Sequence, residues 1–171
     1  MANGSNGART HTLSVLVSNK PGVLTHVSGL FSRRGYNIDS LTVGVTENPE
    51  ISRMTIVAHG DEHVIEQVTK QLNKLIDVIK VIDVTPMEAV DRELALIKVA
   101  AKAQSRSEVI QIVDIFRAKI IDVSSRSMII EVTGDEQKVD ALVLLLRQFG
   151  IKELARTGKV SMVRGARVIK A

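Results

Sequence analysis

The chain has 171 residues, of which 44% are hydrophobic, and its formal net charge is +4. This length accommodates one domain or two small ones, and no apolar run approaches the roughly 20 residues of a membrane-spanning helix. The absence of cysteine excludes disulfides, thiolate metal sites and cysteine nucleophiles, and it fits a reducing compartment such as the cytoplasm.

The first ten residues are small and polar, so we expect residues 1–10 to form a disordered leader rather than a signal sequence. A strand should follow, because polar and apolar residues alternate from Thr12 to Ser18. The turn Asn19-Lys20-Pro21-Gly22 breaks this strand. Apolar residues then recur at helical spacing from Val23, and Gly35 suits the C-terminal end of that helix.

A second strand is predicted on the alternation of polar and apolar residues around 40–45, and a third around 54–58. Asp61 and Glu62 suit the first turn of a second helix, where negative charge complements the helix dipole. A fourth strand is expected over 78–84. Residues 11–84 therefore have the order βαββαβ.

A linker is expected over 85–93, and the same order of elements then begins again. Residues 94–160 are predicted to form a second βαββαβ unit, and residues 161–171 to form a solvated basic tail. The repeat is visible in the residues themselves, since Met54 and Gly60-Asp61-Glu62 are matched by Met128 and Gly134-Asp135-Glu136. Internal repetition of this kind predicts an α+β fold of two tandem ferredoxin-like domains.

The two copies differ at the turn before their first helix. The first copy has Asn19-Lys20-Pro21-Gly22, whereas the second has about Ala103 to Arg106, without glycine or proline. Glycine allows close backbone approach to a ligand, and the free N–H groups at a helix start favour an anion. We therefore expect the first copy to bind a small anionic group.

Four segments together resemble the small regulatory subunit of acetohydroxyacid synthase (acetolactate synthase), a family with ACT (amino-acid-binding) domains. They are the NKPG turn, RRGYNIDSLTVG, SRMTIVAHGDE and FRAKIIDVS. The resemblance implies an N-terminal ACT domain followed by an ACT-like domain, a homodimer formed through the ACT domains, and no catalytic activity in this chain. It also implies a separate catalytic subunit that holds thiamine diphosphate, a divalent metal and FAD, and feedback inhibition by a branched-chain amino acid, usually valine.

The resemblance also implies where the effector binds. The backbone N–H groups of Gly22, Val23 and Leu24 would receive the valine carboxylate, and Asn19 would hydrogen-bond the ligand from the turn. Asn37 and the backbone of Ile38, supplied by the second chain of the dimer, would meet the ammonium group. The second strand would lie at a sheet edge, where pairing with another chain is possible.

Two other functions compete with this one. An RNA-binding tandem shares the βαββαβ order, but such domains read bases with aromatic side chains, and only 2% of this chain is aromatic. A stand-alone amino-acid sensor that regulates another enzyme remains the alternative within the regulatory class.

Catalytic and metal sites are not predicted. The four histidines (His11, His26, His59, His63) lack metal-site spacing, because Gly60-Asp61 separates the last two. The repeated acidic pairs at 61–62 and 135–136 are explained by helix starts.

Overall fold

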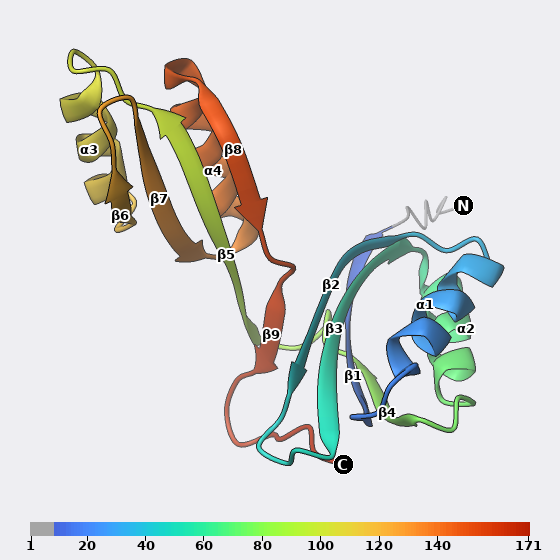
Figure 1. Cartoon of the computed structure of the whole chain (residues 1–171). Coiled ribbons are helices and arrows are strands. Elements are labelled where there is room, and N and C mark those ends of the chain that lie inside the picture. The colour runs from blue at the N-terminus through green and yellow to red at the C-terminus, as the bar shows by residue number, and fades with distance from the viewer. Residues whose placement is uncertain (1–8) are drawn as a thin grey trace, which may run out of the picture. The chain divides into compact units, whose positions relative to one another are not determined.

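The computed structural model describes residues 9–171, so residues 1–8 of the predicted leader lie outside the described part. The chain forms two compact units, one of residues up to Val90 together with Ser161–Ala171, and the other of Asp91–Val160. In each unit two helices cover one face of an antiparallel sheet (Figure 1). Among the described residues, no helix is long and apolar enough to cross a membrane.

The first unit follows the predicted order βαββαβ. Its elements are β1 (Arg9–Ser18), α1 (Val23–Arg33), β2 (Ile38–Val45), β3 (Ile51–Gly60), α2 (Glu62–Leu72) and β4 (Val78–Asp83). The strands lie in the order β2-β3-β1-β4, which puts β2 at an edge. The predicted edge position of the second strand is thereby confirmed.

The second unit repeats this arrangement. Its elements are β5 (Ala89–Ala100), α3 (Arg106–Ile115), β6 (Lys119–Val123), β7 (Ser127–Gly134), α4 (Glu136–Leu146), a 3-10 turn η1 (Arg147–Phe149) and β8 (Ile151–Arg156). The sheet order β6-β7-β5-β8 matches that of the first unit. The prediction of two tandem ferredoxin-like βαββαβ units is confirmed.

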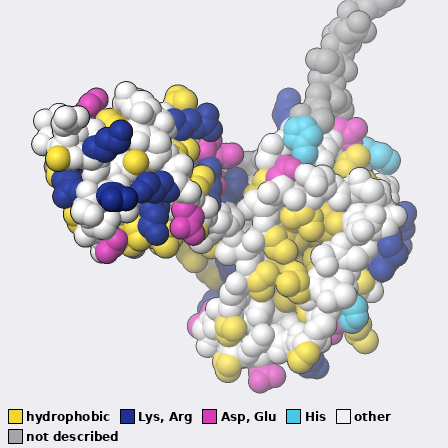
Figure 2. Space-filling model, turned by 45° about the horizontal axis from the view of Figure 1, so that its top comes forward, with side chains coloured by type: hydrophobic (Ala, Val, Ile, Leu, Met, Phe, Trp, Pro, Cys, Tyr) yellow, Lys and Arg dark blue, Asp and Glu magenta, His cyan; other side chains and the backbone are white. Residues whose placement is uncertain are grey.

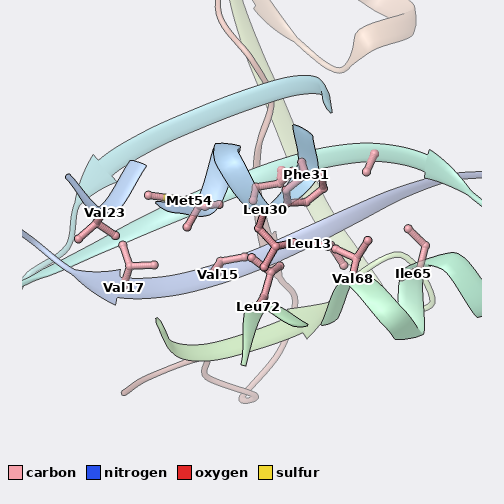
Figure 3. Close-up of a cluster of buried hydrophobic side chains, with 13 residues drawn as sticks. Leu13, Val15, Val17, Val23, Leu30, Phe31, Met54, Ile65, Val68 and Leu72 are labelled. Carbon is pink, nitrogen blue, oxygen red and sulfur yellow. The ribbon is translucent and has the colours of Figure 1, made fainter. Parts of the chain in front are cut away.

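The core of the first unit lies between its helices and its sheet (Figure 3). Leu13 and Val15 of β1 and Met54 of β3 contribute from the sheet, and all three are at most 1% exposed. Phe31 of α1 and Val68 of α2 close the cluster from the helices. The alternation on the strands and the helical spacing on the helices thus meet on one shared apolar layer.

The acidic pairs are confirmed as helix starts. The Asp61 carboxylate accepts a hydrogen bond from the Val64 amide at 2.8 Å, and the Asp135 carboxylate accepts one from the Lys138 amide at 2.9 Å. Each bond satisfies a backbone donor that lacks a partner within the helix. The same cap in both copies fixes the β3–α2 and β7–α4 junctions.

The C-terminal segment is not the solvated tail that we expected. Residues Val160–Val163 form a strand, β9, which pairs with β5, and β5 itself begins at Ala89 within the expected linker. Ile169 is 5% exposed, in a cluster with Leu16 and Val84. Arg53 donates to the Ile169 carbonyl at 2.8 Å and Lys80 donates to the Lys170 carbonyl at 3.0 Å. The cause is Leu16, which points to the face of β1 opposite the helices and would otherwise face water.

Candidate functional site

The turn between β1 and α1 presents backbone N–H groups that lie ahead of the first hydrogen bond of the helix. Gly22 precedes α1 with φ 87°, a left-handed conformation that suits glycine. The first helical hydrogen bond runs from the His26 amide to the Gly22 carbonyl at 3.1 Å, so the amides of Val23 and Leu24 lie ahead of it. Within residues 9–171 no side chain caps α1, and its first turn holds no acidic residue. Such a helix start is positively polarised and suits an anion.

Asn19 belongs to the same turn, and its side chain already has two partners. Its Nδ2 donates to the Pro49 carbonyl at 2.8 Å, and its Oδ1 accepts from the Ser52 hydroxyl at 3.1 Å. Asn19 therefore fastens the β2–β3 turn beside the start of α1. An amide nitrogen carries two N–H donors, so the bond to Pro49 leaves the second for a ligand. We call these two hydrogen bonds of Asn19 the Asn19 clamp. Ser52 was not identified as part of it from the sequence.

Asn37 and Ile38 lie at the other end of α1. An 11-residue helix separates them from Gly22, and at 1.5 Å per residue this is about 16 Å. The Asn37 Nδ2 donates to the Asp39 carboxylate at 2.7 Å on the surface. Within one chain the structure brings together Asn19 to Leu24, and it places Asn37 and Ile38 in a separate group. The two groups of a single chain are therefore too far apart for one small ligand to reach both.

The edge strand β2 runs between these two groups and has β3 as its one neighbour among the described strands. Val43 and Val45 point from it to the helix side, yet they are 43% and 59% exposed. Leu24 of α1 is 45% exposed. An apolar strip beside an unpaired strand edge is a surface on which a second chain can pair. On the other face of β2, a Cβ added to Gly44 would meet no atom within 4 Å.

The corresponding turn of the second unit is closed by an arginine. Arg106, the first residue of α3, donates from Nη2 to the carbonyls of Ser124 at 2.8 Å and of Ala101 and Ser125 at 3.3 Å. Ser105 precedes this helix with φ −102°, so no left-handed glycine is present. The sequence prediction noted the missing glycine but not the closure by Arg106.

Among residues 9–171 no group of three or more metal-ligating side chains lies close enough to hold a metal ion. Two of the histidines have carboxylate partners, since His11 bonds Asp83 at 2.9 Å and His26 bonds Asp77 at 3.1 Å.

The ion pair of Arg156 with Glu93 spans 2.6 Å in the second unit. Burial alone would lower the pKa of Arg156, but its hydrogen bonds to Asp140 and Glu93 outweigh this and raise the pKa. These contacts connect strands and helices of the fold, which gives the histidines and the arginine a structural role.

Comparison with protein families gives two adjacent matches. Residues 13–80 match the AHAS small subunit-like ACT domain, and this match runs from within β1 to the middle of β4. Residues 92–165 match the small subunit of acetolactate synthase, which covers the second unit. The candidate site lies in the part that matches the ACT domain.

Whole-chain relatives carry the same description. The chain is 63% identical over 155 residues to a probable acetolactate synthase small subunit from Archaeoglobus fulgidus, covering 91% of this chain and 97% of the relative. It is 56% identical over 167 residues to the acetolactate synthase small subunit of Mycolicibacterium smegmatis, covering 98% of each. The crystal structure of the acetolactate synthase small subunit from Thermotoga maritima superposes with a TM-score of 0.87 at 49% identity, covering 93% of this chain and 99% of that one.

Proposed function

Because the chain belongs to the family of acetolactate synthase small subunits, we propose that it is the non-catalytic regulatory subunit of that enzyme. It binds a cytoplasmic catalytic subunit that holds thiamine diphosphate, a divalent metal and FAD. It raises the activity of that subunit and makes it sensitive to feedback inhibition by a branched-chain amino acid, valine. The observation that carries the effector site is the uncapped start of α1 behind Gly22.

Valine presents a carboxylate, an ammonium group and a small branched apolar group. The N–H groups of Gly22, Val23 and Leu24 receive the carboxylate, because they lie ahead of the first helical hydrogen bond, at the positive end of the helix dipole. The remaining N–H of Asn19 donates to the ligand from the side of the turn. The exposed Leu24 side chain offers an apolar contact next to the carboxylate site.

The ammonium group is met by a second copy of the chain. In a two-fold symmetric dimer with α1 helices side by side and antiparallel, the start of one helix lies beside the end of the other. Asn37 and Ile38 of the second copy then complete the site that begins at Gly22. The separation of the two groups by about 16 Å within one chain, the length of an 11-residue helix, supports this arrangement. Strand β2, which pairs with β3 alone among the described strands, and its exposed valines supply the pairing surface.

A site shared between two chains links occupancy to dimer geometry. If valine binds one dimer arrangement more tightly by about 1–3 kcal/mol, binding of valine changes the affinity for the catalytic subunit. Binding of the catalytic subunit changes the affinity for valine by the same coupling free energy. Regulation then requires no chemistry in this chain, only a difference in affinity between two arrangements.

The shared site is tested by complementation between two defective chains. Gly22→Asp places a carboxylate at the carboxylate site, and Asn37→His removes the amide from the ammonium site, so each homodimer should lose valine binding. A heterodimer of the two variants has one site with both defects and one intact site. Refolded mixtures should therefore recover about one quarter of the wild-type sites, since half the dimers are mixed and each has one good site of two.

Titration calorimetry on wild-type chain, each variant and the mixture measures this. Recovery in the mixture supports a site built by two chains, whereas no recovery with folded, dimeric variants places the site within one chain. Unchanged valine affinity in both single variants would show that the effector binds elsewhere.

Co-purification distinguishes the proposed regulatory subunit from a stand-alone amino-acid sensor. The wild-type chain should retain the thiamine-diphosphate enzyme of the same organism and raise its rate of acetolactate formation. A chain that binds valine but neither retains nor activates that enzyme would be the sensor.

A further inference from the structure

One end of the second unit carries an excess of positive charge, although Glu108 and Glu153 lie just beyond it in the sequence. Three segments form this end, namely 100–106, 124–127 and 147–152, and we call it the basic end. It holds five basic residues and no aspartate or glutamate: Lys102, Arg106, Arg126, Arg147 and Lys152. Figure 2 shows Lys and Arg side chains gathered on the face of the second unit that is turned toward the viewer.

Hydrogen bonds join the three segments into one surface. The Ala101 amide donates to the Arg126 carbonyl at 3.1 Å, and the Ala100 amide donates to the Gly150 carbonyl at 2.9 Å. The Lys152 ammonium lies 3.4 Å from the Arg126 carbonyl. The cations are thus held on a fixed backbone frame and do not depend on one flexible loop.

The side chains that make up this charge are available to a partner. Lys102, Arg126, Arg147 and Lys152 are all exposed. Arg106 is the exception, because its guanidinium bonds the carbonyls within the turn. Exposed cations with no anionic neighbour on the same segments repel one another, and an acidic surface relieves this repulsion.

Apolar side chains border the basic end. Helix α4 ends beside Arg147 with the run Leu142 to Leu146. Leu144 is 63% exposed and Leu145 is 43% exposed, although the rest of the run is buried. One turn into α3, Ile110 is 37% exposed. Exposed apolar side chains that adjoin arginine offer a surface on which another protein can pack.

We propose that the basic end of the second unit docks onto an acidic surface with an apolar centre on the catalytic subunit. This inference rests on the proposed function and identifies the surface of this chain that meets its partner. The exposed leucines favour a protein partner over RNA, because RNA binding of this fold uses aromatic side chains. The same end of the first unit differs, since Lys20 and Lys74 are outnumbered there by Glu47, Glu50 and Asp77.

Charge reversal on the full chain tests the proposal. Arg126→Glu with Lys152→Glu changes the net charge by −4 at the basic end. The matched control, Lys74→Glu with Arg92→Glu, makes the same change at exposed positions elsewhere. Leu144→Ser with Leu145→Ser removes the apolar border without changing charge, and circular dichroism shows that each variant is folded.

The measurement is the affinity for the catalytic subunit by surface plasmon resonance at 50 and 300 mM salt. We expect the basic-end reversal to weaken binding at least ~10-fold and to flatten its salt dependence, because each lost cation removes steering and a desolvated contact. The serine variant should weaken binding about 5-fold with an unchanged salt dependence, whereas the control should stay within about 2-fold.

The outcomes distinguish this proposal from the proposed function. Failure of the wild-type chain to bind the catalytic subunit refutes the proposed function, and the docking surface with it. Wild-type binding that the basic-end variants leave unchanged refutes the docking surface alone. If the serine variant instead loses its dimeric state in light scattering, or if the reversal abolishes RNA binding but not partner binding, the surface serves another contact and the proposal is overturned.

Discussion

The two copies of the βαββαβ unit share a fold and differ at one turn. Both have the same strand order, and both start their second helix with a capping aspartate, Asp61 or Asp135. The first copy leaves the start of its first helix open behind Gly22, whereas Arg106 fills the equivalent turn of the second. Core packing and helix caps are shared by the two copies and maintain the fold. The residues of one turn, Gly22 or Arg106, determine whether backbone N–H groups are accessible to an anion.

The largest effect is expected from breaking the partly buried ion pair of the second copy, in which Glu93 is buried and Arg156 reaches the surface. Arg156 bonds Glu93 from both Nε and Nη2, at 2.7 and 2.6 Å, and the Glu93 side chain is 9% exposed. Arg156→Ala leaves that carboxylate without its partner and should lower the free energy of unfolding by about 3 kcal/mol. Urea denaturation followed by circular dichroism measures the loss.

A double replacement controls this experiment. Glu93→Leu with Arg156→Leu removes both charges together and should recover most of the lost stability. Valine affinity should stay within about 2-fold in the double variant, because the proposed effector site lies in the first copy. The expected loss for Arg156→Ala alone is about 3 kcal/mol. A measured loss below about 1 kcal/mol in the free energy of unfolding would show that Glu93 finds water or another partner.

The next effect is on effector binding and contrasts the two turns directly. Gly22→Asp should weaken valine binding at least ~30-fold, or about 2 kcal/mol, because its carboxylate repels the ligand at short range. Ser105→Asp makes the same change at the start of α3 and should leave valine affinity unchanged. Equal losses in the two variants, measured by calorimetry, would contradict the assignment of the ligand to the first copy.

Gly22→Ala separates backbone strain from charge. A Cβ at Gly22 would meet no atom within 4 Å, so its cost comes from φ 87° alone. This variant should lose about 1 kcal/mol of stability. It should keep more of its valine affinity than Gly22→Asp does. Identical affinities in the two variants would attribute the effect to conformation rather than charge.

Opening the second turn should have a smaller effect on stability than Arg156→Ala. Arg106→Ala removes hydrogen bonds to three carbonyls and should lower the free energy of unfolding by about 1–2 kcal/mol. An exposed residue in the segment before α3 provides a control, and Lys102→Ala should cost less than about 0.5 kcal/mol. Opening the turn should create no valine site, because Ser105 does not supply the left-handed glycine. Binding of a second equivalent of valine to Arg106→Ala would overturn that distinction.

Much of the fold follows from the sequence because its signals are local. The alternation on β1, the helical spacing after Val23, and the repeated Gly-Asp-Glu before α2 and α4 each depend on neighbours within a few residues. Gly22 was identified for the same reason, since a helix start needs only the preceding turn. The second residue group at Asn37 came from family resemblance, and no local pattern distinguishes it from a strand entry.

The features that the sequence did not reveal depend on contacts between distant segments. Arg106 reaches carbonyls 18 and 19 residues away, which only the pairing of β5 with β7 brings near. Only one local feature of the sequence indicated that a segment would pack where Ile169 does. This feature is Leu16, which shares a face of β1 with the polar residues Thr12 and Ser14. A single apolar residue on a polar face does not say which segment will cover it.

The smallest effect concerns the hydrogen bonds that tie Asn19 to the β2–β3 turn. Ser52 is 5% exposed and donates to Asn19, whose own amide holds the Pro49 carbonyl. Ser52→Ala should lower the free energy of unfolding by about 1 kcal/mol. It should weaken valine binding about 2-fold through a less fixed Asn19, which corresponds to about 0.4 kcal/mol.

Ser14 provides the matched control on the neighbouring strand. It is 0% exposed, and its hydroxyl has no partner among the described residues, so Ser14→Ala should be neutral or stabilising. Both variants remove one buried hydroxyl, but only the Ser52 hydroxyl bonds Asn19. If Ser14→Ala and Ser52→Ala reduce valine affinity equally, the loss comes from sheet packing and not from the Asn19 clamp. A selective loss in Ser52→Ala shows that the first copy fixes its turn through Asn19, whereas the second closes its own with Arg106.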